Sequence, residues 1–318
     1  MEKSFEDCVT EGALPEIENL RIYKEEKVYE RISNGLIPQN NPTAILLGGQ
    51  IASGKSTLSQ KTHSEFDLKG KIAAVDGDAL RDFHPLFKKY NSENDKLTAA
   101  YTSIDSNRWT EKLVNDLARD RCNMVVETTL KNKKVVTNFA EKLNDIGYDI
   151  QAKILIVSYE KSLLGAYARY EYGKTERGAG RFVPDHVLNA SYTALPEALQ
   201  ALKEQNICSC VHLYTREGVL FEGDYRSTDI VALVKQERCR EFTQNEIKFL
   251  TDGWKEVGDQ MIARGASSDE FAEIIDRMGN RIKMMKIEGV DSNNIDTMTN
   301  IQRDFKKQFA KDFEINPR

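Results

Sequence analysis

The sequence predicts an α/β fold in which helices flank a parallel sheet and an all-helical extension follows at the C-terminal end. Three observations predict it. Short apolar runs alternate with amphipathic helical stretches up to about residue 223, as in a parallel sheet covered on both faces. A glycine-rich turn with the spacing of a phosphate-binding loop follows the first run. After about residue 228 the strand pattern stops and helical spacing continues.

The predicted elements follow one another along the chain. A polar helical stretch covers residues 15–36, and Asn40-Asn41-Pro42 ends it, because a proline disfavours helix in the residue before it. Strands are predicted at 43–49, 71–78, 122–129 and 149–158, and as a pair around Glu217-Gly218 within 209–223. Helices are predicted from Lys55 onward, over 106–121 and over 133–146.

The C-terminal extension is predicted to form helices over residues 241–313. Two apolar sets recur at helical spacing, separated by a helix end and a cap at 265–268. The sets are Leu250, Trp254, Val257 and Met261, then Phe271, Ile274, Ile275, Met278 and Ile282. We expect an N-terminal helical segment at 1–41 that packs on the core, a sheet domain at 42–235 and the extension at 236–318. The extension is either a further helical layer or a small module of its own.

Composition excludes several classes of protein. Hydrophobic residues make up 40% of the 318 residues and charged residues 30%, which is typical of a globular protein. A net charge of −5 argues against a duplex nucleic-acid partner. The number of cysteines, five, is odd, and their spacing fits neither a disulfide framework nor a metal site, which favours reduced thiols. With no apolar run of about 20 residues and no secretory signal in MEKSFEDCVTEG, we expect a cytoplasmic protein without a membrane partner.

The phosphate-binding motif lies between the first strand and a helix. Gly49 to Ser56 fits G-x-x-x-x-G-K-[ST] at every fixed position, in the strand-to-helix context that the motif requires. Glycines let backbone N–H groups surround phosphate oxygens, Lys55 reaches the β- and γ-phosphates, and Ser56 supplies a hydroxyl to Mg²⁺. The residues expected to bind ATP are Gly49, Gln50, Ile51, Ala52, Ser53, Gly54, Lys55, Ser56 and Thr57. The sequence therefore predicts a P-loop NTPase or kinase.

Acidic residues follow the next two predicted strands. Asp76 and Asp78 come at the carboxyl end of one strand, where open α/β sheets bind ligands. Asp78 can accept the proton of an attacking hydroxyl, or it can cap the next helix, whereas Asp76 supports the loop. Glu127 ends the following strand and can bind an acceptor or a metal-bound water, or act as a Walker B acid, and Thr129 can donate a hydrogen bond.

Several cations follow the fourth predicted strand. Arg169 and Arg181 bracket a segment interrupted by Gly173, Gly178 and Gly180. Such a segment suits a mobile lid that closes over ATP and neutralises charge in the transition state. The alternative is a solvated, charged helix face.

With these motifs in order, the sequence resembles the zeta toxins of bacterial toxin–antitoxin systems. The matching segments are PTAILLGGQ with SGKS, VDGDALRDFHP, SNRWTEKL, VVETT, ARYE, GRFVP and LYTREGV, across about residues 42–225. The resemblance implies a kinase that uses ATP and Mg²⁺ to phosphorylate the 3′-hydroxyl of UDP-N-acetylglucosamine and so blocks the supply of peptidoglycan precursors. It also implies a small helical antitoxin that blocks the ATP site.

The resemblance also implies roles for single residues, by motif position. Lys55 and Ser56 hold ATP–Mg²⁺, Asp78 is the base for the sugar hydroxyl, and Arg169 and Arg181 contact phosphates. The residues expected to bind the sugar nucleotide are Asp76, His84, Arg108, Glu127, Thr128, Thr129 and Lys131. The chain departs from many members, which have Gly in place of Thr128 and Arg in place of Lys131. The lysine keeps the charge but loses the bidentate geometry of an arginine.

Other functions stay open from the sequence. The acceptor can instead be a nucleotide, a dinucleotide cofactor, an antibiotic or a polynucleotide end. The P-loop can also belong to a nucleotide-gated interaction module without catalysis. The helices after residue 236 can inhibit the kinase in cis, or dock elsewhere.

Overall fold

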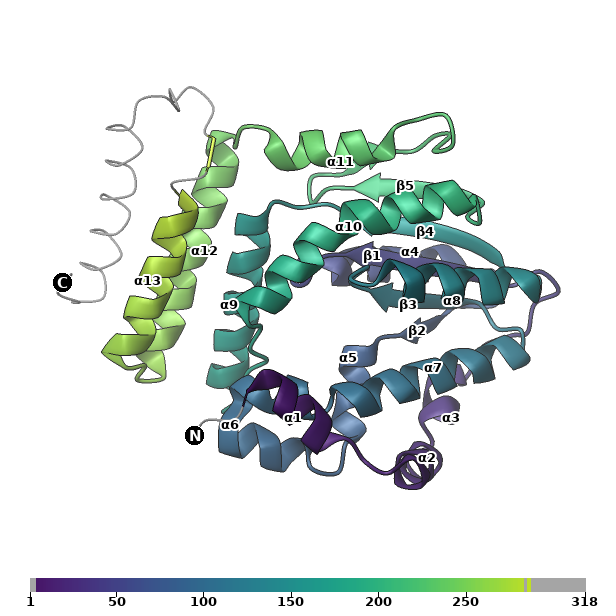
Figure 1. Cartoon of the computed structure of the whole chain (residues 1–318), viewed down its shortest axis with the longest axis horizontal. Helices are drawn as coiled ribbons and strands as arrows, with labels where there is room; N and C mark the ends of the chain where they lie inside the picture. Colours follow the sequence, from purple (N-terminus) through teal and green to yellow (C-terminus); the bar gives the residue numbers. More distant parts are fainter. Residues whose placement is uncertain (1–3, 283–284, 287–318) are drawn as a thin grey trace. The chain divides into compact units, whose positions relative to one another are not determined.

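The computed structural model describes residues 4–282 and 285–286 (Figure 1). The chain forms two compact units. The first consists of residues 1–157 and 181–235, and the second of residues 158–180 and 236–318, each within the described ranges. The domain boundaries predicted at residues 41 and 235 stay a prediction.

A six-stranded sheet forms the centre of the first unit. The strand order is β2-β3-β1-β4-β5-β6, and every neighbouring pair is parallel except β5 and β6. The strands are β1 (Thr43–Gly49), β2 (Ala73–Val75), β3 (Met124–Thr128), β4 (Asp149–Leu155), β5 (Cys210–Tyr214) and β6 (Val219–Phe221). All six lie within the predicted runs, so the predicted α/β class with a parallel sheet is confirmed. The strand before the phosphate motif, β1, lies inside the sheet, where Leu46 pairs with Val126 of β3 and Ala152 of β4.

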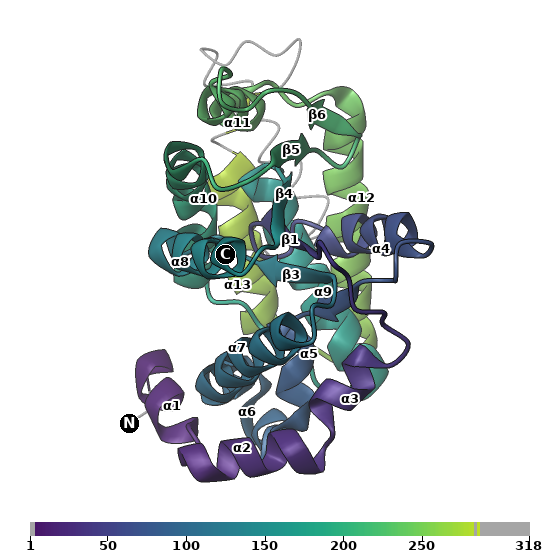
Figure 2. The ribbon, with the colours of Figure 1, turned by 90° about the vertical axis from the view of Figure 1, so that its right-hand side faces the viewer.

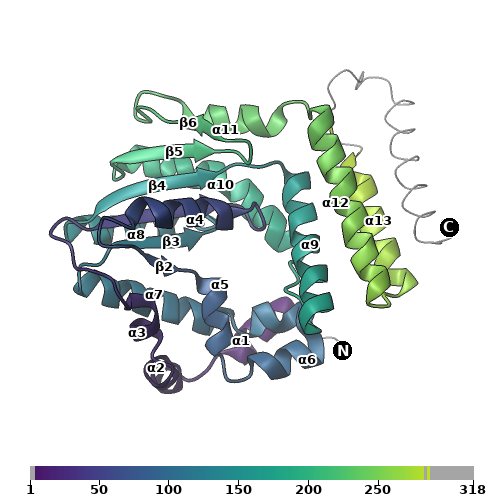
Figure 3. The same cartoon turned by 180° about the vertical axis from the view of Figure 1, so that it is seen from behind.

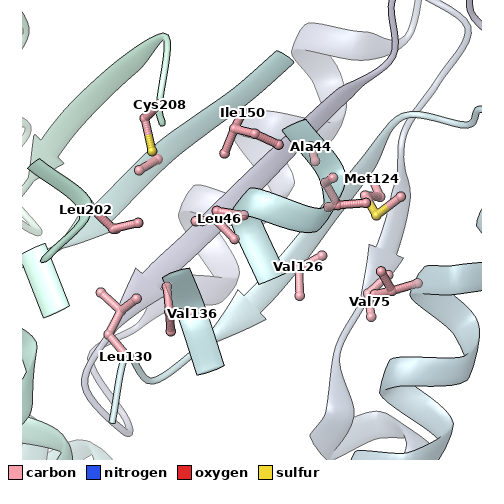
Figure 4. Packing of buried hydrophobic residues seen from close by; sticks show 14 of the residues in the cluster. Ala44, Leu46, Val75, Met124, Val126, Leu130, Val136, Ile150, Leu202 and Cys208 are labelled. Carbon is pink, nitrogen blue, oxygen red and sulfur yellow. The ribbon is translucent and has the colours of Figure 1, made fainter. Parts of the chain in front are cut away.

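Helices cover both faces of this sheet, which explains why the inner strand β1 is buried from Ala44 to Gly49 and carries only apolar side chains there. Figure 2 shows α8 and α10 on one face and α4 on the other. Alternate residues of β1 divide between the faces: Leu46 joins the cluster on one side, and Ile45 and Leu47 pack with Leu58 of α4 on the other. Figure 4 shows the first cluster. The helices are α4 (Lys55–Phe66), α7 (Ser103–Arg119), α8 (Lys133–Asp145), α10 (Asp185–Gln205) and α11 (Ile230–Cys239).

Short N-terminal helices pack on the helices that follow β2. The indole Nε1 of Trp109, in α7, donates to the carbonyl of Asn19 over 2.9 Å. Gly12 lies so close to the backbone of Tyr101 that a Cβ atom there would be 2.0 Å from its carbonyl oxygen. The helices are α1 (Phe5–Gly12), α2 (Glu16–Glu25), α3 (Val28–Ser33), α5 (Gly77–Leu80), the 3₁₀ helix η1 (Arg81–Phe83) and α6 (Phe87–Tyr101).

The second unit is helical. It contains α9 (Tyr159–Arg177), α12 (Gln244–Ala263) and α13 (Ser268–Ile282), which run side by side in Figure 3. The helix break predicted at 265–268 is confirmed. Buried residues of the two predicted apolar faces are Leu250, Trp254, Val257, Met261, Phe271, Ile274 and Met278. Ile275 is half-buried, and the side chain of Ile282 and the helices predicted beyond residue 286 lie outside the described residues.

The cysteines and the apolar content of the helices bear on two predictions made from composition. Cys8, Cys122 and Cys208 are buried free thiols, and none of the five cysteines forms a disulfide within the described chain. Among the helices described, none is long and apolar enough to cross a membrane.

Candidate functional site

The phosphate-binding loop connects β1 to α4, as predicted. Three of its residues have positive φ angles: Gly49 at +154°, Ala52 at +56° and Gly54 at +99°. Gly49 also approaches β4, because a Cβ atom there would lie 2.9 Å from the carbonyl oxygen of Leu155. Gly54 directly precedes the first residue of α4. The loop therefore leads into a helix N-terminus, the arrangement that favours anions.

The side chains of the loop divide between two roles. Lys55 Nζ donates to the carbonyl oxygens of Gly49 and Gln50 over 3.0 and 3.3 Å, so its ammonium group lies against the loop. Gln50, predicted to bind ATP, has a fully buried side chain whose Nε2 donates to the carbonyl of Val157 over 2.6 Å. This bond ties the loop to the end of β4, so the side chain supports the loop.

The remaining loop residues differ in exposure. Ser53 is buried, whereas Ser56 and Thr57 are exposed in the first turn of α4. The N–H of Ile51 donates to Ser191 Oγ of α10 over 3.3 Å, and Ala52 is half-buried. The exposed hydroxyl of Ser56 is open to a ligand, and its role in binding magnesium stays a prediction.

Asp76 and Asp78 meet at the end of β2. Asp76 is the N-cap of α5, and its Oδ1 accepts from the N–H of Asp78 over 2.9 Å. Asp78 Oδ2 lies 2.5 Å from Arg181 NH1, and its Oδ1 accepts from Arg81 Nε over 3.1 Å. Arg181 also donates to the backbone carbonyl of Asp78 over 3.1 Å. The cap of α5 is therefore Asp76 and not Asp78, for which the sequence left capping open, and Asp78 presents a half-exposed carboxylate fixed by two arginines.

Glu127, at the end of β3, lies close enough to these groups to interact with them. Burial raises the pKa of the Glu127 carboxyl, and the negative charges of Asp76 and Asp78 raise it further. Lys55 and a hydrogen bond with Ser59 act in the opposite direction. The structure therefore brings the loop lysine and the three acids together at one edge of the sheet.

Two of the predicted acceptor residues lie in a different environment. His84 has a buried side chain whose Nε2 is 3.4 Å from Asp105 Oδ2, and its Nδ1 accepts from the N–H of Leu86. Arg108 donates from NH1 to the carbonyl of Leu14 over 2.8 Å. His84 thus packs on α7 and Arg108 bonds to the N-terminal segment, and a role of either residue in acceptor binding stays a prediction.

The residues after β3 form a turn. Thr128 Oγ1 accepts from the N–H of Leu130 over 3.1 Å, and Leu130 has a φ of +54°. Thr129 is half-buried and Lys131 is exposed. The hydroxyl of Thr128 therefore stabilises the turn locally, while acceptor binding by Thr129 and Lys131 stays a prediction.

The two lid arginines belong to different units. Arg181 lies in the first unit, where it binds Asp78. Arg169 lies in α9 of the second unit and is half-buried. Its assignment to the lid stays a prediction.

Of the three glycines between these arginines, Gly173 and Gly180 lie in close contact with neighbouring backbone. A Cβ atom on Gly180 would lie 2.1 Å from the carbonyl oxygen of Tyr170, and one on Gly173 would lie 2.9 Å from Gly180 Cα. Gly178 ends α9 with a φ of +75° and has open space around it. The glycines let the chain turn and fold back on α9, so they have a packing function that the interpretation as a mobile segment did not include.

Two arginines at this edge of the sheet, Arg81 and Arg216, were not among the predicted site residues. Arg81 is one helical turn after Asp78 and also donates to the Ala99 carbonyl over 2.7 Å. Arg216, in the turn between β5 and β6, donates from Nε to the Ser53 carbonyl over 3.0 Å and from NH2 to the Ala52 carbonyl over 3.4 Å. The sequence offered one indication of Arg216: it follows a predicted strand, and the carboxyl ends of parallel strands meet at one edge of a sheet.

The donor set suits a nucleotide-bound magnesium ion better than a metal held by protein alone. In the part of the chain that the structure describes, no three His, Cys, Asp or Glu side chains form a metal-binding group. Mg²⁺ is commonly held by one or two protein oxygens together with substrate phosphates. The exposed Ser56 hydroxyl, in the first turn of α4, could supply one such protein oxygen.

The chain resembles known proteins over most of its length. It matches the family model described as Zeta toxin over residues 26–225. It is 27% identical to "Toxin PezT" of Streptococcus pneumoniae over 230 residues, 72% of this chain and 90% of that protein. It is 31% identical to "Toxin zeta" of Streptococcus agalactiae over 196 residues, 61% of this chain and 67% of that protein. A structure of the PezAT chromosomal toxin–antitoxin system of Streptococcus pneumoniae superposes with a TM-score of 0.68 and 25% identity, covering 79% of this chain and 99% of that one.

Proposed function

The chain belongs to the zeta toxin family, and from that premise we propose that it is the toxin of a toxin–antitoxin system and transfers the γ-phosphate of ATP to the 3′-hydroxyl of UDP-N-acetylglucosamine. The observation that carries the proposal is the position of Asp78. Its carboxylate is fixed by Arg81 and Arg181 on the same edge of the sheet as the phosphate-binding loop. A nucleotide site alone would not need a carboxylate held in this way.

Each group at this edge has a part in the transfer. Lys55 and the loop N–H groups would hold the β- and γ-phosphates, and Ser56 would hold Mg²⁺, which would neutralise charge on the phosphates. Asp78 accepts the proton of the attacking hydroxyl. Arg181 and Arg169 stabilise the negative charge of the transferring group. Glu127 orients the acceptor or a metal-bound water.

The cellular role follows from the relatives. Two of them are toxins, and a third comparison is with a toxin–antitoxin system. We propose that this chain likewise acts with a small helical antitoxin, in the cytoplasm, where ATP and the sugar nucleotide are found. Phosphorylation of UDP-N-acetylglucosamine would withhold it from peptidoglycan synthesis.

The test is an ATP-consumption assay on wild type and Asp78→Asn. Wild type should release ADP only when UDP-N-acetylglucosamine is present. Asp78→Asn should lower kcat by about 100-fold or more, because a general base contributes on that order. Equal ADP release with and without the sugar nucleotide would reject this acceptor. Toxicity that survives Asp78→Asn would favour the non-catalytic interaction module.

A second acceptor is the main alternative. Lys131 is exposed and offers a single ammonium where many members have an arginine fork. The lysine in place of an arginine leaves room for an acceptor other than UDP-N-acetylglucosamine. A screen of nucleotides, dinucleotide cofactors and antibiotics, with mass detection of one added phosphate, separates the alternatives.

A further inference from the structure

The helix that carries Arg169 packs along the C-terminal helices. Helices α9 and α12 lie side by side in both Figure 1 and Figure 3. Their contacts follow the same order along both helices, so they run parallel. The residues of α9 in these contacts recur at three- and four-residue intervals, which places them on one face: Lys161, Leu164, Tyr167 and Glu171.

An ion pair near the start of α9 is buried. Lys161 Nζ lies 2.6 Å from Glu246 Oε1, and the two side chains are 5% and 9% exposed. Arg240 donates from both terminal nitrogens to the same carboxylate over 2.7 Å each. The Glu246 carboxylate also accepts from the N–H of Thr243 and so caps α12. One end of the contact therefore depends on a charge network with several partners.

A second buried ion pair lies further along α9. Glu171, whose side chain is 1% exposed, accepts from Arg264 Nε over 2.5 Å and from Arg264 NH2 over 3.0 Å. Arg264 also binds Glu270, in the first turn of α13, over 2.7 Å. The pair thus joins α9 to the connection between α12 and α13.

Close apolar packing lies between the two ion pairs. A Cβ atom on Gly253 would be 2.6 Å from Leu164 Cδ2, so α12 approaches α9 closely at this point. The rings of Tyr167 and Trp254 lie 5.6 Å apart. The guanidinium of Arg277, in α13, lies 4.9 Å from the ring centre of Tyr167. The contact therefore has close side-chain packing in the middle and an ion pair between α9 and its partners at each end.

This arrangement fixes the register and the rotation of α9. Sliding or turning the helix would leave Lys161 and Glu171 as buried charges without their partners, which is strongly unfavourable. Arg169 precedes Glu171 by two residues. Two residues span about 200° around an α-helix, so Arg169 points to the side opposite Glu171.

We propose that α12 and α13 act as a clamp that sets the position of α9, and that Glu171 and Arg264 are positioning residues for Arg169. This inference rests on the proposed function, because it assigns Arg169 to phosphoryl transfer. Its expected effect on turnover is opposite to that of inhibition in cis by the same helices. Loosening the clamp lowers turnover, whereas releasing an inhibitor would raise it.

The direct test of the clamp is amide hydrogen exchange in the full chain. Arg264→Met removes both bonds to Glu171, and peptides of α9 should then exchange about tenfold faster or more, while those of α4 stay unchanged. Arg264→Lys should keep part of the protection, because it retains the charge. The matched control is Lys248→Met, which removes an exposed ion pair with Asp252 on the same helix. Unchanged exchange in α9 would overturn the clamp, whatever the acceptor.

The positioning role is tested by kinetics in two backgrounds. In wild type, Arg264→Met should lower kcat by about tenfold or more with a smaller change in KM, as expected for a misplaced catalytic group. In Arg169→Ala, the same change should cost less than about twofold, because the residue it acts through is gone. An equal loss in both backgrounds, or full activity of Arg169→Ala, would overturn the positioning role. Absence of turnover in wild type with UDP-N-acetylglucosamine would reject the acceptor and leave the exchange result to decide the clamp.

Discussion

Asp78 depends on arginines from two parts of the chain. Arg81 is anchored by the Ala99 carbonyl and the Thr102 hydroxyl, over 2.7 and 3.0 Å, so it holds the carboxylate from a fixed base. Arg181 reaches the same carboxylate from a segment 103 residues later. A base held on both oxygens has little freedom to rotate, so its position depends on the fold and not on its own side-chain torsions.

Arg216 shows how a residue outside the motif can shape the phosphate-binding loop. Its guanidinium donates to the carbonyls of Ala52 and Ser53, two residues of the loop. We predict that Arg216→Ala raises KM for ATP by about tenfold with little change in kcat, because the loss falls on ground-state binding. Steady-state kinetics with varied ATP measures this.

The control for Arg216 is Lys142→Ala, which removes an exposed cation from α8. It should leave both constants unchanged. Arg216→Lys should fall between wild type and Arg216→Ala, since the lysine keeps the charge but lacks the planar guanidinium fork with which Arg216 reaches both carbonyls. A loss of kcat with an unchanged KM would contradict the role assigned to Arg216.

Glu127 is predicted to cost stability at neutral pH. Burial and two nearby carboxylates raise its pKa in the folded chain above the ordinary value of 4.5. The folded state then binds a proton more readily than the unfolded state, so stability falls as pH rises through this range. Glu127→Gln should therefore raise the Tm at pH 7, show no such gain below pH 4, and lower kcat.

Thermal melts of Glu127→Gln at both pH values test this prediction. The matched control is Glu141→Gln, which removes a carboxylate from the exposed surface of α8. It should change neither Tm. A lower Tm for Glu127→Gln at pH 7 would mean that the carboxylate stabilises the fold.

At the scale of elements, the connection after α9 depends on a close backbone approach. A side chain at Gly180 would collide with the backbone of Tyr170, which cannot move without shifting the helix. Gly180→Ala should therefore lower the free energy of unfolding by about 1–3 kcal/mol, as overpacking does. Urea denaturation measures it. Gly178→Asn is the control, because that position has open space and a φ that asparagine tolerates, and it should be nearly neutral.

Strands and amphipathic helices were predictable from local sequence pattern, whereas the helices that pack against one another were not. Each strand of the sheet falls within a predicted apolar run, since strands buried on both faces need continuous apolar sequence. The joining of α9 to the C-terminal helices was missed. It depends on Lys161 with Glu246 and Glu171 with Arg264, which are 85 and 93 residues apart. In the sequence these are ordinary charged residues on polar helices, and nothing local distinguishes a buried ion pair from two solvated charges.

At the scale of the whole molecule, contacts between residues distant in the sequence were again hard to predict, and this separates the two halves of the proposed site. The proposed donor side was predictable because one contiguous motif contains the loop, the lysine and the proposed magnesium ligand. The proposed acceptor side combines residues at the ends of β2 and β3 with Arg181, so only the ends of strands pointed to it. His84 illustrates the difference. The family resemblance implied that it binds the sugar nucleotide, and the fold buries its side chain against Asp105 of α7.

Nucleotide binding is predicted to stabilise the folded chain as a whole-molecule property. A ligand that binds only the folded state adds about 2.7 kcal/mol at a hundred times its Kd, whatever local contacts it makes. Saturating ATP with Mg²⁺ should therefore raise the Tm of wild type and of Asp78→Asn alike, because Asp78 acts on the acceptor. Lys55→Met should abolish the gain, since Lys55 is the cation that reaches the phosphates. Differential scanning calorimetry with and without nucleotide, in the absence of acceptor, makes the comparison. An equal gain in Lys55→Met would place nucleotide binding outside the loop, and a loss of the gain in Asp78→Asn would make that residue part of the donor side.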